Sequence, residues 1–206
     1  MNTTLPTVAA LLLALGFTSA ARAVPDGPLG ELSTPGAVAA PEGAMAARLA
    51  YNLGYDAFEK GDFPTARDKF ESAAKADPEL KEAWNMIGHV SRRLADYDRS
   101  LVAYDKALAL DPAYPEAIEY RAETFLALNR LDDAKAAYLG LLASSRSHAD
   151  VLLESMRQWV AARRRAPAGV AASDIDAFAK WVEARGTIAR QTASMNLGRA
   201  VVHRWD

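Results

Sequence analysis

The chain has 206 residues, half of them hydrophobic, so it is long enough to bury a sizeable core in one or two domains. Its net charge is −2, so no strong global field attracts nucleic acid. The sequence contains no cysteine, which excludes disulfides, thiolate metal sites, a cysteine nucleophile and a lipid anchor on an N-terminal cysteine.

Residues 1–23 have the features of a secretory signal peptide. A short apolar run extends from Leu5 to Phe17, and Ala21-Arg22-Ala23 supplies the small-x-small pattern before a cleavage point. The run is too short for a stable membrane span. No Lys or Arg stands between Met1 and the run, so an N-terminus that stays uncleaved is the alternative. The Ala- and Arg-rich composition is typical of GC-rich bacteria. We therefore expect cleavage after Ala23, no stable membrane span afterwards, and a periplasmic or secreted bacterial protein.

Residues 24–43 are rich in Pro and Gly and show no periodic apolar pattern. Such a stretch cannot bury enough apolar surface to offset the conformational entropy lost on ordering. We interpret it as a flexible linker.

From Ala47 onward a 34-residue pattern repeats without gaps, in units 47–80, 81–114 and 115–148. Each unit has small residues at its eighth and twentieth positions and an aromatic residue at its twenty-fourth. In order of position, these are Gly54, Gly88 and Ala122, then Ala66, Ser100 and Ala134, then Phe70, Tyr104 and Tyr138. Small residues let two helices approach closely, and the aromatic ring fills the gap between units. The pattern therefore predicts helix-turn-helix units.

The turn within each unit is predicted at Gly61, Ala95 and Asn129. Glycine and asparagine suit the left-handed residue that ends a first helix. Pro78 and Pro112 close the first two units, because a proline lacks an N–H and its ring clashes with the preceding turn.

At these residues the chain resembles the tetratricopeptide repeat family. The second unit carries nearly the whole family pattern, in Trp84, Ile87, Gly88, Ser100, Tyr104, Ala107 and Pro112. The first unit has Ala50 in place of Trp, and Arg146 stands where the third would have Pro. The resemblance covers about half of the chain. It implies an all-α fold, a right-handed α-solenoid in which each unit needs a neighbour to cover its apolar face.

Residues 149–206 are predicted to form C-terminal capping helices. An amphipathic helix places Leu152, Met156 and Trp159 on one face, and the stretch 166–169 breaks it. Ser173-Asp174 then offers an N-cap for a second helix. This pair would seal the apolar end of the stack. The role of residues 196–206 is not indicated by any pattern.

No catalytic constellation is present in the sequence. The three histidines lie far apart, at positions 89, 148 and 203, with no carboxylate at a metal-ligand spacing. The chain has no HExxH motif, Gly-rich phosphate loop or GxSxG elbow. We therefore expect no enzymatic activity, no metal and no cofactor.

The resemblance implies that the first helix of each unit lines a concave groove that binds a peptide or helix of a partner protein. The positions that line this groove in the family correspond here to Tyr51, Tyr55, Phe58, Asn85, His89, Arg92, Glu119 and Glu123. Tyr51, Tyr55 and Phe58 would form an exposed aromatic hot spot, although packing against the linker or the next unit is the alternative. Glu119 and Glu123 would receive a basic peptide or form a solvated face.

Chaperone-binding members of the family hold a terminal carboxylate with Lys, Asn and Arg side chains. The matching positions here are Tyr51, Tyr55, Met86, Glu116 and Tyr120, and none carries the required residue. The sequence therefore predicts a scaffold that does not grip a peptide's C-terminus in that way.

Two other functions stay open. The mildly basic C-terminal helices could dock on the acidic third unit of another copy, giving a self-associating structural protein. Alternatively, the chain could be an accessory subunit of an exported enzyme complex.

Overall fold

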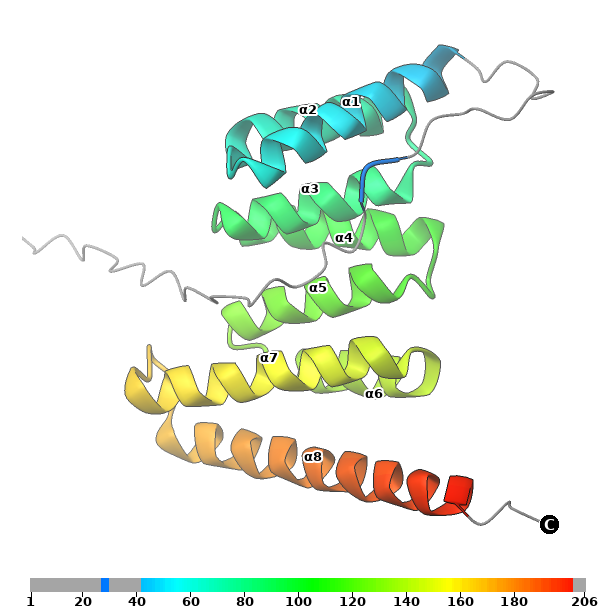
Figure 1. Cartoon of the computed structure of the whole chain (residues 1–206). Coiled ribbons are helices and arrows are strands. Elements are labelled where there is room, and N and C mark those ends of the chain that lie inside the picture. Colours follow the sequence, from blue (N-terminus) through cyan, green and yellow to red (C-terminus); the bar gives the residue numbers. More distant parts are fainter. Residues whose placement is uncertain (1–26, 30–41, 202–206) are drawn as a thin grey trace, which may run out of the picture.

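The computed structural model describes residues 27–29 and 42–201, and this part of the chain is all-helical with no strand. The predicted signal peptide, most of the predicted linker and residues 202–206 lie outside the described residues. The helices are α1 (Glu42–Glu59), α2 (Phe63–Ala76), α3 (Lys81–Arg93), α4 (Tyr97–Leu110), α5 (Pro115–Ala127), α6 (Leu131–Ser144), α7 (Arg146–Arg165) and α8 (Ala172–Val201). The predicted fold class, an all-α solenoid, is confirmed (Figure 1).

The turn inside each of the first three hairpins passes through one residue with a left-handed backbone. These residues are Gly61, Ala95 and Asn129, with φ of 76°, 59° and 58°. The next residue's N–H then bonds back to a carbonyl of the first helix, as in Asp96 N to Ser91 O at 2.9 Å. This closure satisfies carbonyls at the helix end that would otherwise lack a donor. The turn positions predicted from sequence are confirmed.

The small and aromatic positions of the repeat meet across each hairpin. A Cβ added to Gly88 would lie 2.7 Å from the Tyr104 ring, and one added to Gly54 would lie 2.9 Å from the Phe70 ring. Both rings are fully buried. These two glycines are thus required by the close approach of the paired helices, as the repeat predicts.

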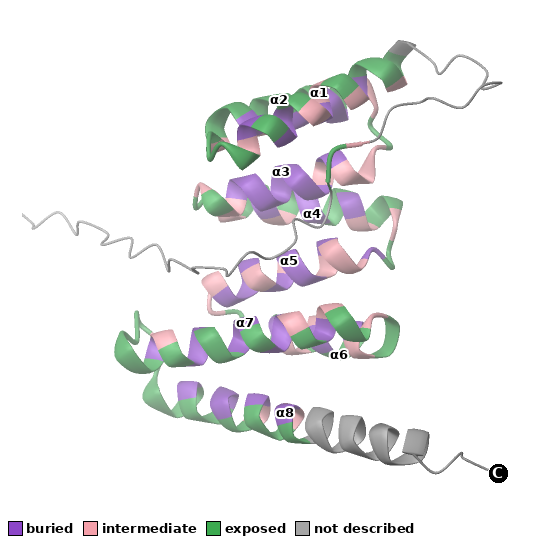
Figure 2. Ribbon diagram, viewed as in Figure 1, coloured by how far each residue is buried: buried purple, intermediate pink, exposed green. Residues whose placement is uncertain are grey.

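The odd-numbered helices lie on the inner side of the stack. In the described part of the chain α3 packs against α5 and α5 against α7, whereas no comparable contact joins α2 to α4 or α4 to α6. When stacked hairpins approach more closely along one edge than the other, the closer edge becomes the concave side of the solenoid. Helix α3 is enclosed by its neighbours, and Figure 2 shows most of its visible face as buried.

Helices α7 and α8 continue the stack at its C-terminal end. The Trp159 indole N–H donates to the Leu126 carbonyl at 2.7 Å, which fixes α7 against α5. On its other side Trp159 meets the edge of Phe178 at 5.2 Å between ring centroids, and Phe178 stacks on Trp181. The turn between α7 and α8 contains Ala168 and Gly169, both with positive φ. Within the part of the chain that the structure describes, no helix has the length and apolarity needed to cross a membrane.

Candidate binding groove

A row of three aromatic side chains crosses the concave side. The His89 ring of α3 stands between Phe58 of α1, at 5.3 Å between centroids, and Tyr120 of α5, at 4.8 Å. Both contacts are edge-to-face, the arrangement that ring quadrupoles favour. We call Phe58, His89 and Tyr120 the aromatic row. It joins three successive units side by side.

A second row, polar and charged, lies one helical turn further along α3 and α5 and extends to α7. Arg92 Nη2 of α3 lies 2.9 Å from Glu123 Oε2 of α5, and Ser155 Oγ of α7 donates to Glu123 Oε1 at 2.7 Å. The Arg92 and Glu123 side chains are only 14% and 12% exposed. We call Arg92, Glu123 and Ser155 the charged row. A largely buried carboxylate is satisfied there by one cation and one hydroxyl.

Burial and neighbouring groups shift the pKa of Arg92 in the charged row and of Tyr104 beside it. Burial opposes the charge on Arg92, but the Glu123 carboxylate together with Tyr104 and Tyr120 more than offsets this, so the pKa of Arg92 is raised. Burial also raises the pKa of Tyr104, which lies beside Arg92 and against Gly88. The arginine is therefore held charged and the tyrosine held neutral.

Both rows join residues about 31 positions apart, although the sequence repeats every 34. Phe58, His89 and Tyr120 follow one another at this spacing, as do Arg92 and Glu123. The difference of three residues is nearly one helical turn, so each first helix meets its neighbour about a turn closer to the neighbour's N-terminus. A search at the spacing of 31 would have found these partners in the sequence.

Of the eight residues predicted for the groove, four belong to the two rows and four lie outside them. Phe58, His89, Arg92 and Glu123 belong to the rows. Tyr51 is fully buried with its ring edge-to-face on Phe70 at 5.2 Å, and the remaining three, Tyr55, Asn85 and Glu119, are also buried. The expected exposed stripe of tyrosines is therefore absent. The fifth position of the first unit faces α2, so Tyr51 packs within its own hairpin, while Tyr55 joins the hydrophobic cluster shared by α1, α2 and α3.

Asn52 is a polar residue of this side that sequence reasoning missed. Its Oδ1 accepts from the Leu29 N–H at 2.8 Å, and its Nδ2 donates to the Leu29 carbonyl at 3.0 Å. Leu29 also packs against the hydrophobic cluster formed by α1, α2 and α3. Asn52 occupies the sixth position of its unit, next to the fifth position, at which the family resemblance places a groove residue.

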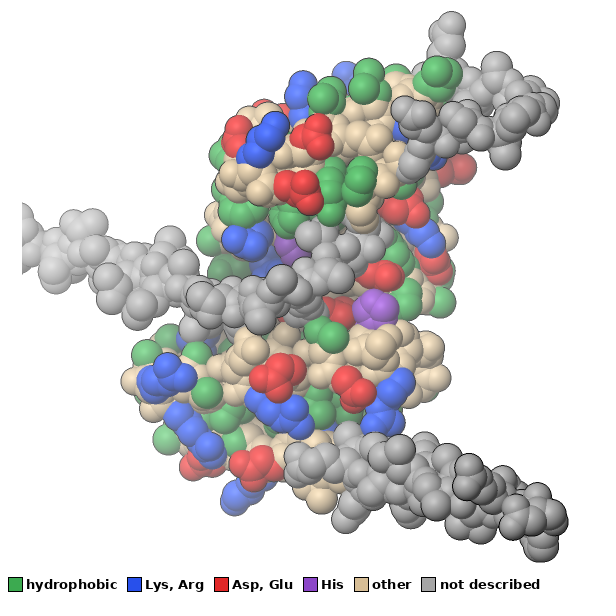
Figure 3. Space-filling model, viewed as in Figure 1, with side chains coloured by type: hydrophobic (Ala, Val, Ile, Leu, Met, Phe, Trp, Pro, Cys, Tyr) green, Lys and Arg blue, Asp and Glu red, His purple; other side chains and the backbone are tan. Residues whose placement is uncertain are grey.

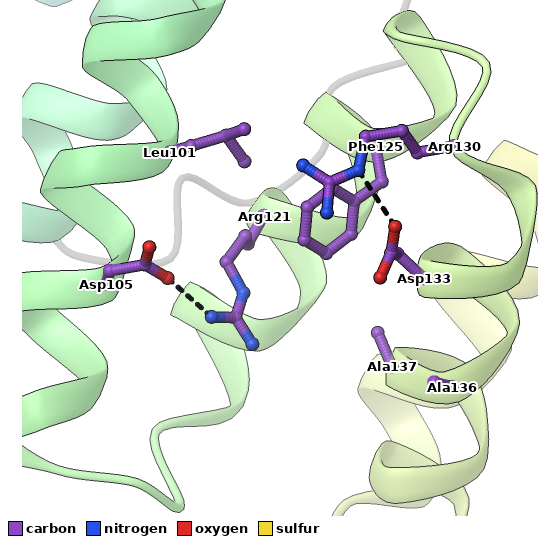
Figure 4. Close-up of a pocket in the computed structure, with 8 residues that line it drawn as sticks. All are labelled: Leu101, Asp105, Arg121, Phe125, Arg130, Asp133, Ala136 and Ala137. Carbon is purple, nitrogen blue, oxygen red and sulfur yellow. Dashed lines mark hydrogen bonds and ion pairs between the residues drawn. The ribbon is translucent and has the colours of Figure 1, made fainter.

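A second candidate site is a pocket of about 500 Å³ between α4, α5 and α6. Figure 4 shows the Phe125 ring there with Arg121 and Arg130 beside it, and Arg130 lies 4.4 Å from the ring centroid. Each arginine is already paired, Arg121 with Asp105 at 2.6 Å and Arg130 with Asp133 at 2.8 Å. The pocket therefore offers no unneutralised charge to an ionic ligand.

No group of three or more His, Asp or Glu side chains is placed to hold a metal ion in the described ranges. On the face seen in Figure 3, acidic, basic and hydrophobic side chains of the described residues are interspersed, without a large area of one charge. The arrangement thus offers aromatic and main-chain contacts more than a charged or coordinating centre.

A protein-family model described as tetratricopeptide repeat matches residues 51–115 and 85–149 of this chain. One curated relative, a DnaJ homolog subfamily C member 7 homolog of Schizosaccharomyces pombe, is 31% identical over 87 residues. That match covers 40% of this chain but only 18% of the relative, so the chain spans less than a fifth of the length of that protein.

Solved structures share the fold at lower identity. The first TPR of Spaghetti (RPAP3), bound to the HSP90 peptide SRMEEVD, is similar with a TM-score of 0.52 and 22% identity, covering 55% of this chain and 93% of that one. The Arabidopsis OM64 TPR domain gives 0.53 and 17%, covering 56% and 98%. The first TPR domain of human RPAP3 gives 0.53 and 22%, covering 60% and 98%. These likenesses establish the arrangement of helices.

Proposed function

Because residues 51–149 belong to the tetratricopeptide repeat family, we propose that this chain is a non-catalytic scaffold that binds a segment of a partner protein. The segment, extended or helical, lies on the concave side formed by α1, α3, α5 and α7. The observation that carries this proposal is the pair of side-chain rows, which cross these helices with rigid rings and a neutralised ion pair and leave Phe58 partly exposed.

The aromatic row is the part of the concave side best suited to supply binding energy, through its exposed end. Aromatic side chains bury a large area and lose little conformational entropy, so they dominate many interfaces. Phe58 stays partly exposed at the end of the row, whereas His89 and the neighbouring α3 residues are buried. We therefore place the anchor contact at Phe58.

The partner is proposed to be contacted along its length, and not at a terminal carboxylate. The Spaghetti (RPAP3) domain is a peptide-bound relative in fold, and its identity of 22% carries the fold alone to this chain. The positions at which the family resemblance would place a carboxylate clamp hold Tyr51, Tyr55, Met86, Glu116 and Tyr120, which include no cationic side chain. A protein partner also suits the mixed charges of Figure 3 better than nucleic acid would.

Export to the periplasm or the exterior is part of the proposal. It rests on the signal-peptide pattern of residues 1–23, which lies outside the described residues. The alternative of self-association through the third unit finds less support, because Glu123 is already paired with Arg92 and Ser155, and Glu119 is buried. An accessory role in an enzyme complex remains compatible with the same groove.

The proposal is tested by affinity capture with three forms of the tagged protein. The wild type is compared with Phe58→Ala, which removes the proposed anchor, and with Val102→Ala, which trims a side chain 58% exposed on the outer helix α4. We expect one partner to be retained by the wild type and by Val102→Ala and to be lost with Phe58→Ala. Equal recovery with all three forms would place binding elsewhere on the chain.

A further inference from the structure

The short segment Gly27–Leu29, drawn in blue in Figure 1, touches the helical stack at Asn52. We propose that Asn52 is a site that binds the main chain of an extended peptide, and that its resident ligand is this segment of the chain itself. The segment occupies part of the concave groove and competes there with a partner segment of the same chemistry. The inference rests on the proposed function, because competition requires a partner in the same groove.

The hydrogen bonds at Asn52 are those of a strand pairing. A primary amide presents an acceptor and a donor side by side, and here they engage the N–H and the C=O of one residue, at 2.8 and 3.0 Å. The N–H and C=O of a single residue point the same way only when its backbone is extended. The site therefore selects an extended main chain and places no demand on that residue's side-chain chemistry through these two bonds.

The side chain of Leu29 supplies the second half of the contact. It is partly buried and packs against the hydrophobic cluster that contains Tyr51, Tyr55 and Met86. Gly27 and Pro28 are exposed, so neither adds comparable burial. The contact at Leu29 thus combines two main-chain hydrogen bonds with one aliphatic contact. The ligand class that fits it is an extended segment with a leucine-like residue at that position.

The resident segment has a thermodynamic advantage over an external one, because it is tethered to the groove. Residues 30–41 connect Leu29 to α1, which begins at Glu42. A connection of this length gives an effective concentration on the order of a millimolar for the tethered segment. An external segment with the same contacts must compete with that concentration. Its apparent affinity for the wild-type protein is therefore lower than its affinity for a groove that the resident segment has left.

The docking itself is tested by amide hydrogen exchange of the full-length protein, followed by NMR. Asn52→Leu removes both the donor and the acceptor, and Leu53→Ala changes the neighbouring residue of α1, which is 45% exposed, as a control. We expect the Leu29 amide to exchange about tenfold faster in Asn52→Leu than in the wild type and to be unchanged in Leu53→Ala. Equal exchange in the wild type and Asn52→Leu would overturn the inference.

Competition is tested with a labelled, end-capped peptide of residues 25–33, whose binding is followed by fluorescence anisotropy. Leu29→Ala removes the aliphatic contact of the resident segment and replaces no residue within a helix, so the helical hairpins keep their own contacts. We expect this variant to bind the peptide about tenfold more tightly than the wild type, and the double variant Leu29→Ala, Asn52→Leu to lose that gain. Equal affinity of Leu29→Ala and the wild type would overturn the inference.

The two proposals fail in different ways. Only the self-docking is contradicted if a partner is captured through Phe58 but the Leu29 amide exchanges at the same rate in the wild type and in Asn52→Leu. Only the proposed function is contradicted if the Leu29 amide is protected and the peptide affinities are as expected, but no form of the protein captures a partner.

Discussion

Arg92 of α3 and Glu123 of α5 form an ion pair across two units, with Nη2 and Oε2 2.9 Å apart and both side chains largely buried. Removing one member of a buried pair leaves the other charge uncompensated. Glu123→Gln is therefore expected to lower the free energy of unfolding by about 3 kcal/mol, measured by urea denaturation.

The matched control for this pair is the exposed one between Arg130 and Asp133, whose side chains are both 47% exposed. Asp133→Asn should change the free energy of unfolding by less than about 1 kcal/mol, because an exposed pair is screened by solvent. Equal losses of unfolding free energy in Glu123→Gln and Asp133→Asn would show that the burial of the charged row adds nothing to the stability of the fold.

Replacing Gly88 by alanine is predicted to lower the free energy of unfolding. The added Cβ would meet the Tyr104 ring at 2.7 Å, and the ring is enclosed and cannot move freely. Gly88→Ala should destabilise the protein by about 1–3 kcal/mol. Gly140→Ala in α6, where nothing lies within 4 Å, should instead stabilise it by about 0.5–1 kcal/mol, because alanine favours a helix. The two urea midpoints should move in opposite directions.

Ala95 occupies a left-handed backbone conformation, with φ of 59°, at the turn between α3 and α4. That conformation costs a residue with a Cβ about 1–2 kcal/mol, and glycine avoids this cost. Ala95→Gly should therefore raise the thermal midpoint, with a gain of about 1 kcal/mol after the entropy of glycine is subtracted. Ala136→Gly in the middle of α6 should lower the midpoint, and a drop in both variants would contradict the role of the turn.

Stability should fall at alkaline pH because of buried tyrosines. Burial raises the pKa of Tyr104 and Tyr138, and burial together with Glu59 raises that of Tyr55. The neutral rings stabilise the fold fully below the unfolded pKa of about 10, and this contribution is lost as pH rises toward the folded pKa. Tyr104→Phe should make the decline above about pH 10 less steep, measured by urea unfolding at a series of pH values. An unchanged slope would contradict the assignment to Tyr104.

The hairpins were predictable because their contacts recur inside every unit. Gly88 and Tyr104 lie at fixed positions of the 34-residue pattern, and the turn residue Asn129 follows from backbone preference alone. In each case the two partners lie within one repeat, so aligning the repeats brings them to the same pair of columns.

The contacts between units were not predictable by that alignment. It shows which positions are equivalent, but it does not show how far adjacent units are displaced along their helices. The displacement pairs His89 with Tyr120, and Arg92 with Glu123, at a spacing of 31 residues. It also explains why Glu123, predicted to receive a basic peptide, instead receives Arg92 of the preceding unit.

The most direct test of the concave groove is site-specific photo-crosslinking in the cell that produces the protein. The analogue p-benzoylphenylalanine replaces Phe58 with a similar ring, and a second form carries it at the exposed outer position Val102. We expect one crosslinked partner from position 58 and none of the same mass from position 102. The same partner crosslinked from position 102 and absent from position 58 would contradict binding on the concave side.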